Sequence, residues 1–319
     1  MRNILIIGST GQIGTELTAA LREHLGNSGT VYAGYTKRRS VPEYLQKTGP
    51  SVEIDILDRD ALEKIVETYQ IDTIYNLAAV LSATAEKDPV NAWHVGIDGL
   101  LNVLEVARKY NCAVFTPSSI GAFGPSSPKV NTPQDCVMRP TTIYGVSKET
   151  GELLSDYYFK RFAVDTRSVR FPGLISYTTP PGGGTTDYAV DIFYSAVKGE
   201  KFVCPIGPDT KMDFMYMPDA IRAAIEIMEA DSAKLVHRNS FNVTAMSFSP
   251  KEIAESIRRH KPDFKIEYQI DPLRQGIAES WPDFMDQSCA ETEWGWKPRY
   301  LLDAMVEDML KNVVPEKYN

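Results

Sequence analysis

The feature that most constrains the fold of this chain is a glycine-rich turn near its N-terminus. The turn carries Gly8, Gly11 and Gly14. It lies between an apolar run and a segment with apolar residues at helical spacing, namely Ile13, Leu17, Leu21 and Leu25. Glycine permits a positive φ and a close approach of the backbone, and a helix N-terminus offers free N–H groups to an anion. This order predicts a pyrophosphate site, rather than a tight turn without a ligand, at Gly8, Gly11, Gln12, Ile13 and Gly14.

The first half of the chain alternates short apolar runs with segments of helical periodicity. The expected strands are Ile4–Ile7, Thr30–Gly34, Val52–Ile54, Thr73–Leu77, Ala113–Pro117 and Thr166–Arg170. Strands that are apolar on both faces and alternate with helices predict a parallel sheet covered on both sides. The predicted fold class is therefore α/β, with a doubly wound, Rossmann-type parallel sheet and a smaller C-terminal substrate-binding lobe.

The sequence changes in character after residue 172. Residues 177–188 are rich in proline, glycine and threonine, which is loop composition, whereas Met217-Pro218-Asp219 and Ser249-Pro250 are typical helix starts. We expect residues 1–172 to form a dinucleotide-binding domain, to which a helix and a strand near 217–244 return. Residues 173–216 and 245–319 are expected to form the substrate-binding lobe.

Charge and composition restrict the partners of the chain. It has 319 residues and a formal net charge of −8, which gives no broad basic surface for nucleic acid. No apolar run approaches the ~18 residues that a membrane span requires. The N-terminal apolar run is too short for a secretory signal. We therefore expect a cytoplasmic protein that binds neither nucleic acid nor membrane.

The cysteines and histidines are widely separated along the sequence. The cysteines form no CxxC pair, which favours free thiols in a reducing compartment over a disulfide or zinc framework. The histidines are equally scattered, so we expect no metal site. The residues are Cys112, Cys136, Cys204 and Cys289, with His24, His94, His237 and His260.

Two further segments predict contacts with a dinucleotide. Asp55 and Ile56 end the third expected strand, where a carboxylate and the next N–H can meet an adenine ring. Asp55 as the cap of the following helix is an equal alternative. After the fourth strand, the short side chains around Leu77, Ala78 and Ala79 leave room for a dinucleotide to cross the sheet edge.

A tyrosine and a lysine lie four residues apart at the head of a predicted helix. Tyr144 and Lys148 share one face of that helix, and Ser119 follows an earlier strand. A free phenol, with a pKa near ~10, is a poor base. A neighbouring ammonium and a positively charged nicotinamide favour the phenolate, which can take a proton from an alcohol while hydride leaves the same carbon. Such pairs also arise by chance on surface helices, but the glycine turn and the strand-terminal serine favour catalysis.

The GxxGxxG turn, Ser119 and the YxxxK pair together resemble the extended short-chain dehydrogenase/reductases, the group that includes sugar-nucleotide epimerases. Segments of the second half narrow the resemblance to the short-chain type of L-threonine 3-dehydrogenases, over residues 2 to about 309. These segments are 177–189, 215–219, 247–250, 280–283 and 294–296. The resemblance implies NAD-dependent oxidation of L-threonine at C3 to 2-amino-3-oxobutyrate. It also implies a homodimer built through paired helices, one of which carries Tyr144.

The resemblance also implies roles for single residues. Tyr144 would be the general base, Ser119 its partner and Lys148 the anchor of the cofactor ribose. The polar ends of the amino acid would meet Ser82, Gly184, Thr185 and Thr186. Trp281 would close over the substrate, with a core position as the alternative. Trp294 and Trp296 are expected in the core.

Two positions depart from the family pattern. Gly96 stands where an asparagine is usual, so a water or backbone contact would be missing there. Tyr35 stands at the end of the second strand, where an acid usually binds the ribose 2′-hydroxyl. Lys37 and the two arginines after it could pair with a 2′-phosphate or form a solvated loop. We expect NAD as the cofactor, with weak discrimination against NADP.

Two other functions fit the same residues. A nucleotide-sugar epimerase or dehydratase would use the same tyrosine, lysine and serine, but it needs contacts for a diphosphate. Residues 177–188 include no basic residue, which disfavours that function. A non-catalytic nucleotide sensor on this fold often lacks the tyrosine or the lysine, and both are present here.

Overall fold

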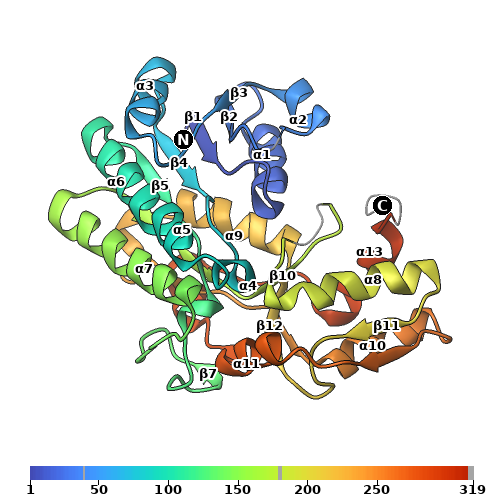
Figure 1. The fold of residues 1–319 in the computed structure, drawn as a ribbon. Helices are drawn as coiled ribbons and strands as arrows, with labels where there is room; N and C mark the ends of the chain where they lie inside the picture. Colours follow the sequence, from blue (N-terminus) through green and yellow to red (C-terminus); the bar gives the residue numbers. More distant parts are fainter. Residues whose placement is uncertain (39, 179–181, 315–319) are drawn as a thin grey trace.

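The computed structural model describes residues 1–38, 40–178 and 182–314, and Figure 1 shows how its helices and strands are arranged. The strands are β1 (Asn3–Ile7), β2 (Thr30–Tyr35), β3 (Ser51–Glu53), β4 (Thr73–Asn76), β5 (Ala113–Phe115), β6 (Ser118–Ser119), β7 (Val130–Thr132), β8 (Thr166–Arg167), β9 (Val169–Phe171), β10 (Gly173–Ile175), β11 (Phe202–Cys204), β12 (Met212–Tyr216), β13 (Phe241–Asn242), β14 (Met246–Phe248), β15 (Ile266–Tyr268) and β16 (Phe284–Met285).

The α-helices are α1 (Gln12–Leu25), α2 (Glu43–Thr48), α3 (Arg59–Tyr69), α4 (Ser82–Ala85), α5 (Pro89–Trp93), α6 (Gly99–Tyr110), α7 (Ile143–Phe162), α8 (Tyr188–Lys198), α9 (Met217–Glu229), α10 (Pro250–His260), α11 (Pro272–Ser280), α12 (Ser288–Trp294) and α13 (Leu302–Asn312). One π-helical turn, η1 (His94–Asp98), precedes α6. Short 3₁₀ turns are η2 (Ile120–Ala122), η3 (Thr185–Asp187) and η4 (Ser232–Lys234).

A six-stranded sheet with the strand order β3-β2-β1-β4-β5-β8 organises the first half of the chain. Every neighbouring pair of these strands is parallel. The chain winds outward from β1 first to one side and then to the other, which is the order of a dinucleotide-binding fold. The predicted α/β, Rossmann-type fold class is confirmed.

The two faces of this sheet pack against different helices. Because side chains alternate along a strand, Leu5 and Ile7 join a core with α3 and α6, whereas Ile4 and Ile6 join a core with α1 and α9. All four side chains are at most 2% exposed. Burying an aliphatic side chain of this size stabilises the fold by roughly 1.5–3 kcal/mol.

The expected strand over Thr166–Arg170 is wrong as a single element, because the structure divides it at Ser168. β8 completes the main sheet beside β5, whereas β9 pairs with β6 and β13 in a separate sheet. The N–H of Ser168 donates to Arg238 O at 3.3 Å, and its carbonyl accepts from Phe241 N at 3.1 Å. These partners come from a distant segment, so local sequence does not reveal the break.

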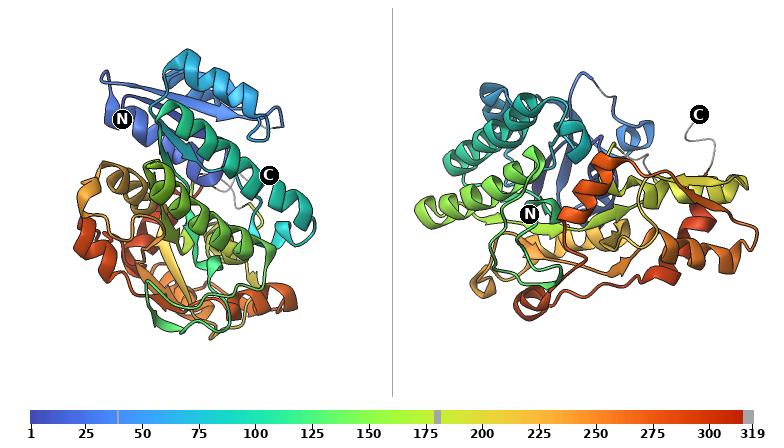
Figure 2. Two further views of the ribbon diagram at one scale, coloured as in Figure 1. Left: turned by 90° about the vertical axis from the view of Figure 1, so that its left-hand side faces the viewer. Right: turned by 60° about the horizontal axis from the view of Figure 1, so that its bottom comes forward.

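The second half of the chain adds smaller sheets, β10-β12-β14 and β11-β15. Their core includes the stacked rings of Phe214 and Phe248, whose centroids are 4.2 Å apart. The expected helix at Met217 is α9, which packs on α1, and α10 begins after Ser249 with the reciprocal cap that Ser249 and Glu252 form. In the left view of Figure 2 the blue-to-teal segments lie at the top and the orange and red segments at the bottom.

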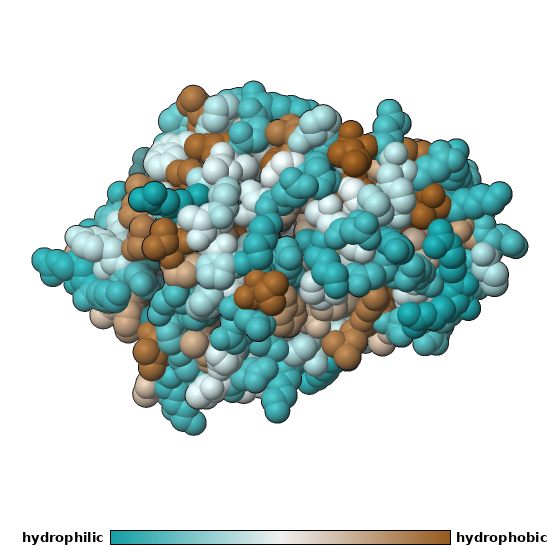
Figure 3. Space-filling model, turned by 90° about the horizontal axis from the view of Figure 1, so that it is seen from below, coloured by the Kyte–Doolittle hydropathy of each residue, from teal (hydrophilic) through white to brown (hydrophobic). Residues whose placement is uncertain are grey.

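The distribution of apolar residues on the surface and the state of the cysteines are consistent with the sequence analysis. On the face shown in Figure 3, apolar residues lie as separate small patches among hydrophilic ones. Within the described part of the chain, no helix combines the length and the apolar character that crossing a membrane requires. The four cysteines are free, as predicted.

Candidate active site

The glycine turn connects β1 to α1 and is held by the neighbouring strands. Gly8 has a φ of +85°, and its N–H and that of Ser9 donate to Gly34 O at 3.2 and 3.0 Å. A Cβ on Gly14 would lie 2.2 Å from Gly8 O, so only glycine fits there. Gly11 caps α1 without a side-chain hydrogen bond. The first N–H groups of α1 can therefore bind an anion, and the turn fits a dinucleotide pyrophosphate.

A cavity of about 590 Å³ lies between this turn and the head of α7. Its size is within the ~300–1,000 Å³ typical of small-molecule sites. The cavity brings together most of the site residues predicted from sequence: Gly8, Gly11, Gln12, Ile13, Gly14, Leu77, Ala79, Ser82, Ser119, Tyr144, Lys148, Gly184, Thr185, Thr186 and Trp281. These residues come from several elements that are far apart in sequence, and they meet at the carboxyl end of the main sheet.

Tyr144 and Lys148 lie on the first turns of α7 and are both half-buried. Lys148 Nζ donates to Pro117 O at 2.8 Å and lies 5.5 Å from the centroid of the Tyr144 ring. The ring packs on Gly121, where a Cβ would lie 3.0 Å from it. The N–H of Gly121 donates to Ser119 Oγ at 3.1 Å. Gly121 in the turn η2 thus contacts both the serine and the tyrosine, and Pro117 holds the lysine, at one end of the cavity.

A buried ion pair holds α7 against the sheets, and the sequence analysis missed it. Glu152 lies four residues after Lys148, and Arg170 on β9 donates to both of its carboxylate oxygens at 2.9 and 2.8 Å. Ser118 also donates to Glu152. Both charged side chains are less than 10% exposed. Burial opposes the charge of Arg170, but Glu152 raises the pKa of the guanidinium above its ordinary value. The signal in the sequence was the position of Glu152, a charged residue on the face of α7 that packs against the sheets.

The expected substrate side of the cavity is formed by hydroxyl groups. Ser82 Oγ lies 3.4 Å from Thr185 Oγ1, and both residues are buried. The N–H groups of Gly183 and Gly184 donate to Asp187 at 2.8 and 2.7 Å. The N–H of Gly184 is therefore occupied by Asp187, and the role of this residue at the substrate stays a prediction. Burial raises the pKa of Asp187, although these two hydrogen bonds act in the opposite direction.

The tryptophans have distinct positions. Trp281 lines the cavity and is 5% exposed, because it packs with Ile120, Ile277 and Met285. It is thus both a core residue and a wall of the site. Trp296 is fully buried and donates from Nε1 to Gln287 at 3.0 Å. Trp294 packs against it and is partly buried, so the predicted core positions are confirmed.

Four residues expected at the cofactor lie outside the main cavity. Asp55 is exposed and accepts from Leu57 N at 3.0 Å, whereas Asp58 caps α3, so the capping alternative for Asp55 is wrong. Ile56 is buried, and its carbonyl accepts from Asn102 at 3.0 Å. The other two are Ala78, which lines a small neighbouring cavity, and Lys37.

Lys37 lies beyond the end of β2, where the expected acid is replaced by Tyr35. Its Nζ is 3.4 Å from Glu53 Oε1, and its side chain is 83% exposed. Glu53 itself stands opposite Tyr35 in the β2–β3 register. An acid from the neighbouring strand thus occupies this edge of the sheet. Arg39, the last member of the expected basic cluster, lies outside the described residues.

Gly96 lies in the π-helical turn η1, beside α7. A Cβ there would meet Ser147 Cβ at 3.5 Å, which is ordinary contact. Gly96 and Lys148 both line the small neighbouring cavity, whose volume of about 30 Å³ is sufficient to hold a water molecule. A side chain would therefore fit at position 96 without a steric clash. Two polar residues, Thr116 and Asn76, line the same small cavity.

A doubly wound sheet with a glycine turn, a Tyr-x-x-x-Lys pair and a serine around one cavity defines a dinucleotide-dependent enzyme of the extended short-chain dehydrogenase/reductase class. Residues 4–244 match the NAD dependent epimerase/dehydratase family. The chain belongs to this family, and the prediction of NAD as its cofactor is confirmed.

Curated relatives are similar over nearly the whole chain. An uncharacterized epimerase/dehydratase of Staphylococcus saprophyticus is 52% identical over 310 residues, which are 97% of this chain and 96% of the relative. Another, from Staphylococcus haemolyticus, is 51% identical over 319 residues and the full length of both proteins.

Solved structures at 40–53% identity are described as L-threonine dehydrogenases. L-threonine dehydrogenase from Clostridium difficile is 53% identical, with a TM-score of 0.94 and 98% of each chain covered. The holo form of a GalE-like L-threonine dehydrogenase from Cupriavidus necator is 50% identical, with a TM-score of 0.93 over 98% of this chain and all of the other. L-threonine 3-dehydrogenase from Trypanosoma brucei is 40% identical, with a TM-score of 0.92 over 98% and 97%. UDP-glucose 4-epimerase from Thermotoga maritima, at 20% identity, shares the fold.

Proposed function

We propose that this chain oxidises the C3 hydroxyl of L-threonine to the ketone of 2-amino-3-oxobutyrate. The observation that carries the proposal is the likeness to L-threonine dehydrogenases at 40–53% identity over 98% of the chain. Bound NAD would supply the hydride acceptor, and the glycine turn with the N-terminus of α1 would hold its pyrophosphate. The remaining steps depend on the side chains around the cavity.

Tyr144 is the proposed general base. It takes the proton of the C3 hydroxyl, and Ser119 holds the same oxygen by a hydrogen bond. Lys148 keeps a positive charge close to the phenol and would bind the cofactor ribose. Its hydrogen bond to Pro117 O orients the ammonium group along the cavity wall, which supports this role.

The polar groups of the cavity suit a small zwitterion. Ser82, Thr185 and Thr186 offer hydroxyl groups to the substrate carboxylate, and Asp187 is a nearby acid for the ammonium group. Trp281 supplies an apolar wall. A site built on hydrogen bonds rejects a wrong substrate strongly, because its own polar groups are then left unpaired.

A nucleotide-sugar epimerase or dehydratase is the second candidate, and the curated relatives' names favour it. That reaction needs partners for a diphosphate. Among the described residues that line the cavity, Lys148 is the only basic one, and it adjoins Tyr144. The composition of the cavity therefore supports the amino acid over the nucleotide sugar.

The proposal extends to the assembly and location of the enzyme. Val146, Leu153 and Tyr157 are exposed apolar residues on α7, and Val90 on α5 is 65% exposed. They support a homodimer built through these helices, although one solved relative at 41% identity is described as monomeric. The free thiols support a reducing, cytoplasmic compartment.

A substrate panel tests the proposal. The enzyme is assayed with NAD by nicotinamide absorbance, using L-threonine, D-threonine, larger hydroxy amino acids and UDP-sugars. We expect kcat/KM for L-threonine to exceed the others by at least ~10²-fold, because mismatched substrates leave polar groups unpaired. Comparable turnover of a UDP-sugar would contradict the proposal and favour the second candidate.

A further inference from the structure

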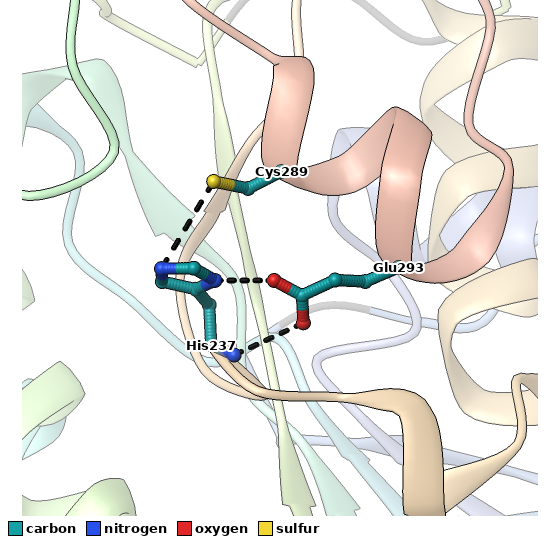
Figure 4. A group of neighbouring side chains, drawn as sticks. All are labelled: His237, Cys289 and Glu293. Atoms are coloured by element: carbon teal, nitrogen blue, oxygen red, sulfur yellow. Dashed lines mark hydrogen bonds and ion pairs between the residues drawn. The ribbon is translucent and has the colours of Figure 1, made fainter.

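A cluster of side chains that could bind a metal lies outside the catalytic cavity. His237 precedes β13, and Cys289 and Glu293 lie four residues apart on α12, so both face the same side of that helix. One candidate ligand atom from each of the three residues lies within 4.8 Å of the other two. Figure 4 shows the imidazole between the thiol and the carboxylate. The three residues are partly buried, and none of them lines the catalytic cavity.

Glu293 holds the His237 ring in one orientation. Its Oε1 is bonded to His237 Nδ1, and its Oε2 accepts from Val236 N at 2.5 Å and from His237 N at 3.1 Å. The carboxylate is 9% exposed. With Nδ1–H donated to Glu293, the lone pair of the ring is on Nε2. A carboxylate behind the other ring nitrogen is the usual support of a histidine metal ligand.

The free nitrogen faces two further ligand types. Cys289 Sγ is 3.9 Å from His237 Nε2, and Asp135 Oδ2 is 3.5 Å from the same nitrogen. Zinc bond lengths in a tetrahedral site place nitrogen and sulfur roughly 3.5 Å apart, and nitrogen and oxygen roughly 3.4 Å apart. The two separations measured from Nε2 are therefore within a few tenths of an ångström of those around a bound ion. Asp135, whose side chain is 86% exposed, is not among the three residues whose ligand atoms all lie within 4.8 Å of one another.

The charges near the thiol also favour a cation. Glu293, Asp286 and Asp135 all act electrostatically on Cys289. Three carboxylates close to these side chains make the surroundings negative, and a bound cation would neutralise this charge. Nitrogen, sulfur and oxygen donors together suit Zn²⁺ better than the oxygen-preferring Mg²⁺ or Ca²⁺.

We propose that His237, Cys289 and Asp135 bind one Zn²⁺, with Glu293 as the residue that positions His237. The ion would join α12, the segment before β13 and the segment around Asp135. It would act on stability rather than on the reaction, because it lies away from the catalytic cavity.

Metal titration of the full-length protein tests this site. After treatment with a chelator, the wild-type protein should bind one Zn²⁺ per chain by calorimetry. His237→Ala and Cys289→Ser should weaken binding at least ~10²-fold, and Glu293→Gln by ~10–100-fold. His24→Ala is the matched control, because His24 pairs with Glu229 at 2.6 Å in an exposed position. Absence of stoichiometric binding, or equal binding by His237→Ala and the wild type, would overturn the proposal.

Two further readouts identify the thiol as a ligand. Co²⁺ should give a near-ultraviolet sulfur-to-metal charge-transfer band that disappears in Cys289→Ser, and a wild-type protein without this band contradicts the site. Zn²⁺ should also slow alkylation of Cys289 in the wild-type protein but not in His237→Ala, measured by peptide mass spectrometry. Equal protection of Cys289 in both proteins would show that binding does not need His237 and would contradict the proposal.

Discussion

The proposed chemistry depends most on one functional group, the phenol of Tyr144. Tyr144→Phe keeps the ring that packs on Gly121 and removes only the acidic proton. We expect kcat to fall by at least ~10²–10⁴-fold, the usual cost of losing a general base, with NAD binding nearly unchanged. Steady-state kinetics and an NAD titration measure both. Tyr157→Phe, an exposed tyrosine of the same helix, is the control. Near-normal turnover in Tyr144→Phe would exclude this residue as the base.

Position 35, at the end of β2, carries a tyrosine where an acid is usual, and this difference affects the choice between NAD and NADP. We expect kcat/KM to favour NAD, but by less than in an enzyme with an aspartate there, because repulsion of a 2′-phosphate is weaker. Lys37 pairs with Glu53 at this edge, where its ammonium group can also pair with the 2′-phosphate of NADP. Lys37→Ala should therefore lower kcat/KM for NADP more than kcat/KM for NAD. Lys47→Ala, which removes an exposed lysine paired with Glu43, is the control. A clear preference for NADP that collapses in Lys37→Ala would contradict NAD as the working cofactor.

Single residues were predictable where a local spacing carries the chemistry. The separation of Tyr144 from Lys148 places both on one helix face, and the cavity brings Ser119 to them. The Glu152–Arg170 pair was not predicted, because its members lie on different elements that meet only in the folded chain. The zinc ligands proposed above were missed for the same reason. His237 and Cys289 are scattered in sequence, and the packing of α12 beside β13 brings them together.

Helix α8 carries a titratable group whose burial affects stability. Asp191 lies in its first turn, where burial and then the charge of Asp187 raise the pKa of the carboxyl from 3.8 to about 6. A raised pKa means that the folded state binds the proton more tightly than the unfolded state. The resulting stability is fully present below pH ~4 and is lost as the pH rises through about 6.

Asp191→Asn should therefore raise Tm at pH 8 and leave it nearly unchanged at pH 4. The neutral amide resembles the protonated acid and removes the cost of a charge near Asp187. Calorimetric scans between pH 4 and pH 8 measure the difference, with Asp60→Asn in the exposed first turn of α3 as the control. A Tm difference that is the same at both pH values would show that the charge of Asp191 is not responsible.

Helices and strands were predictable where the segments that they pair with lie close by in the sequence. The strands of the main sheet follow one another with helices between them, so apolar runs and periodicity were sufficient. The break at Ser168 was not predictable, because its hydrogen bonds come from the segment around Arg238 and Phe241. The hydrogen bonds of Asp187 to Gly183 and Gly184 likewise depend on how η3 folds back. Composition predicted a loop there but not which donors would be occupied.

The assembled molecule is expected to be a homodimer. Leu153 is 65% exposed on α7, beside the exposed Tyr157, and both become buried if two copies of this helix pair. Leu153→Glu should halve the mass measured by light scattering, because a charge in an apolar interface is costly. Val203→Glu, at an exposed apolar position on β11, is the matched control. A wild-type monomer, or a dimer that persists in Leu153→Glu, would contradict pairing through α7.

The transfer of hydride from C3 of L-threonine is the central claim, and a labelled substrate tests it most directly. L-threonine with deuterium at C3 is incubated with the enzyme and NAD, and the reduced nicotinamide is analysed by mass spectrometry. We predict that the deuterium appears on the nicotinamide, and that L-threonine labelled at C2 leaves the nicotinamide unlabelled. Retention of the C3 deuterium in the amino acid, or label arriving from C2, would contradict oxidation at C3.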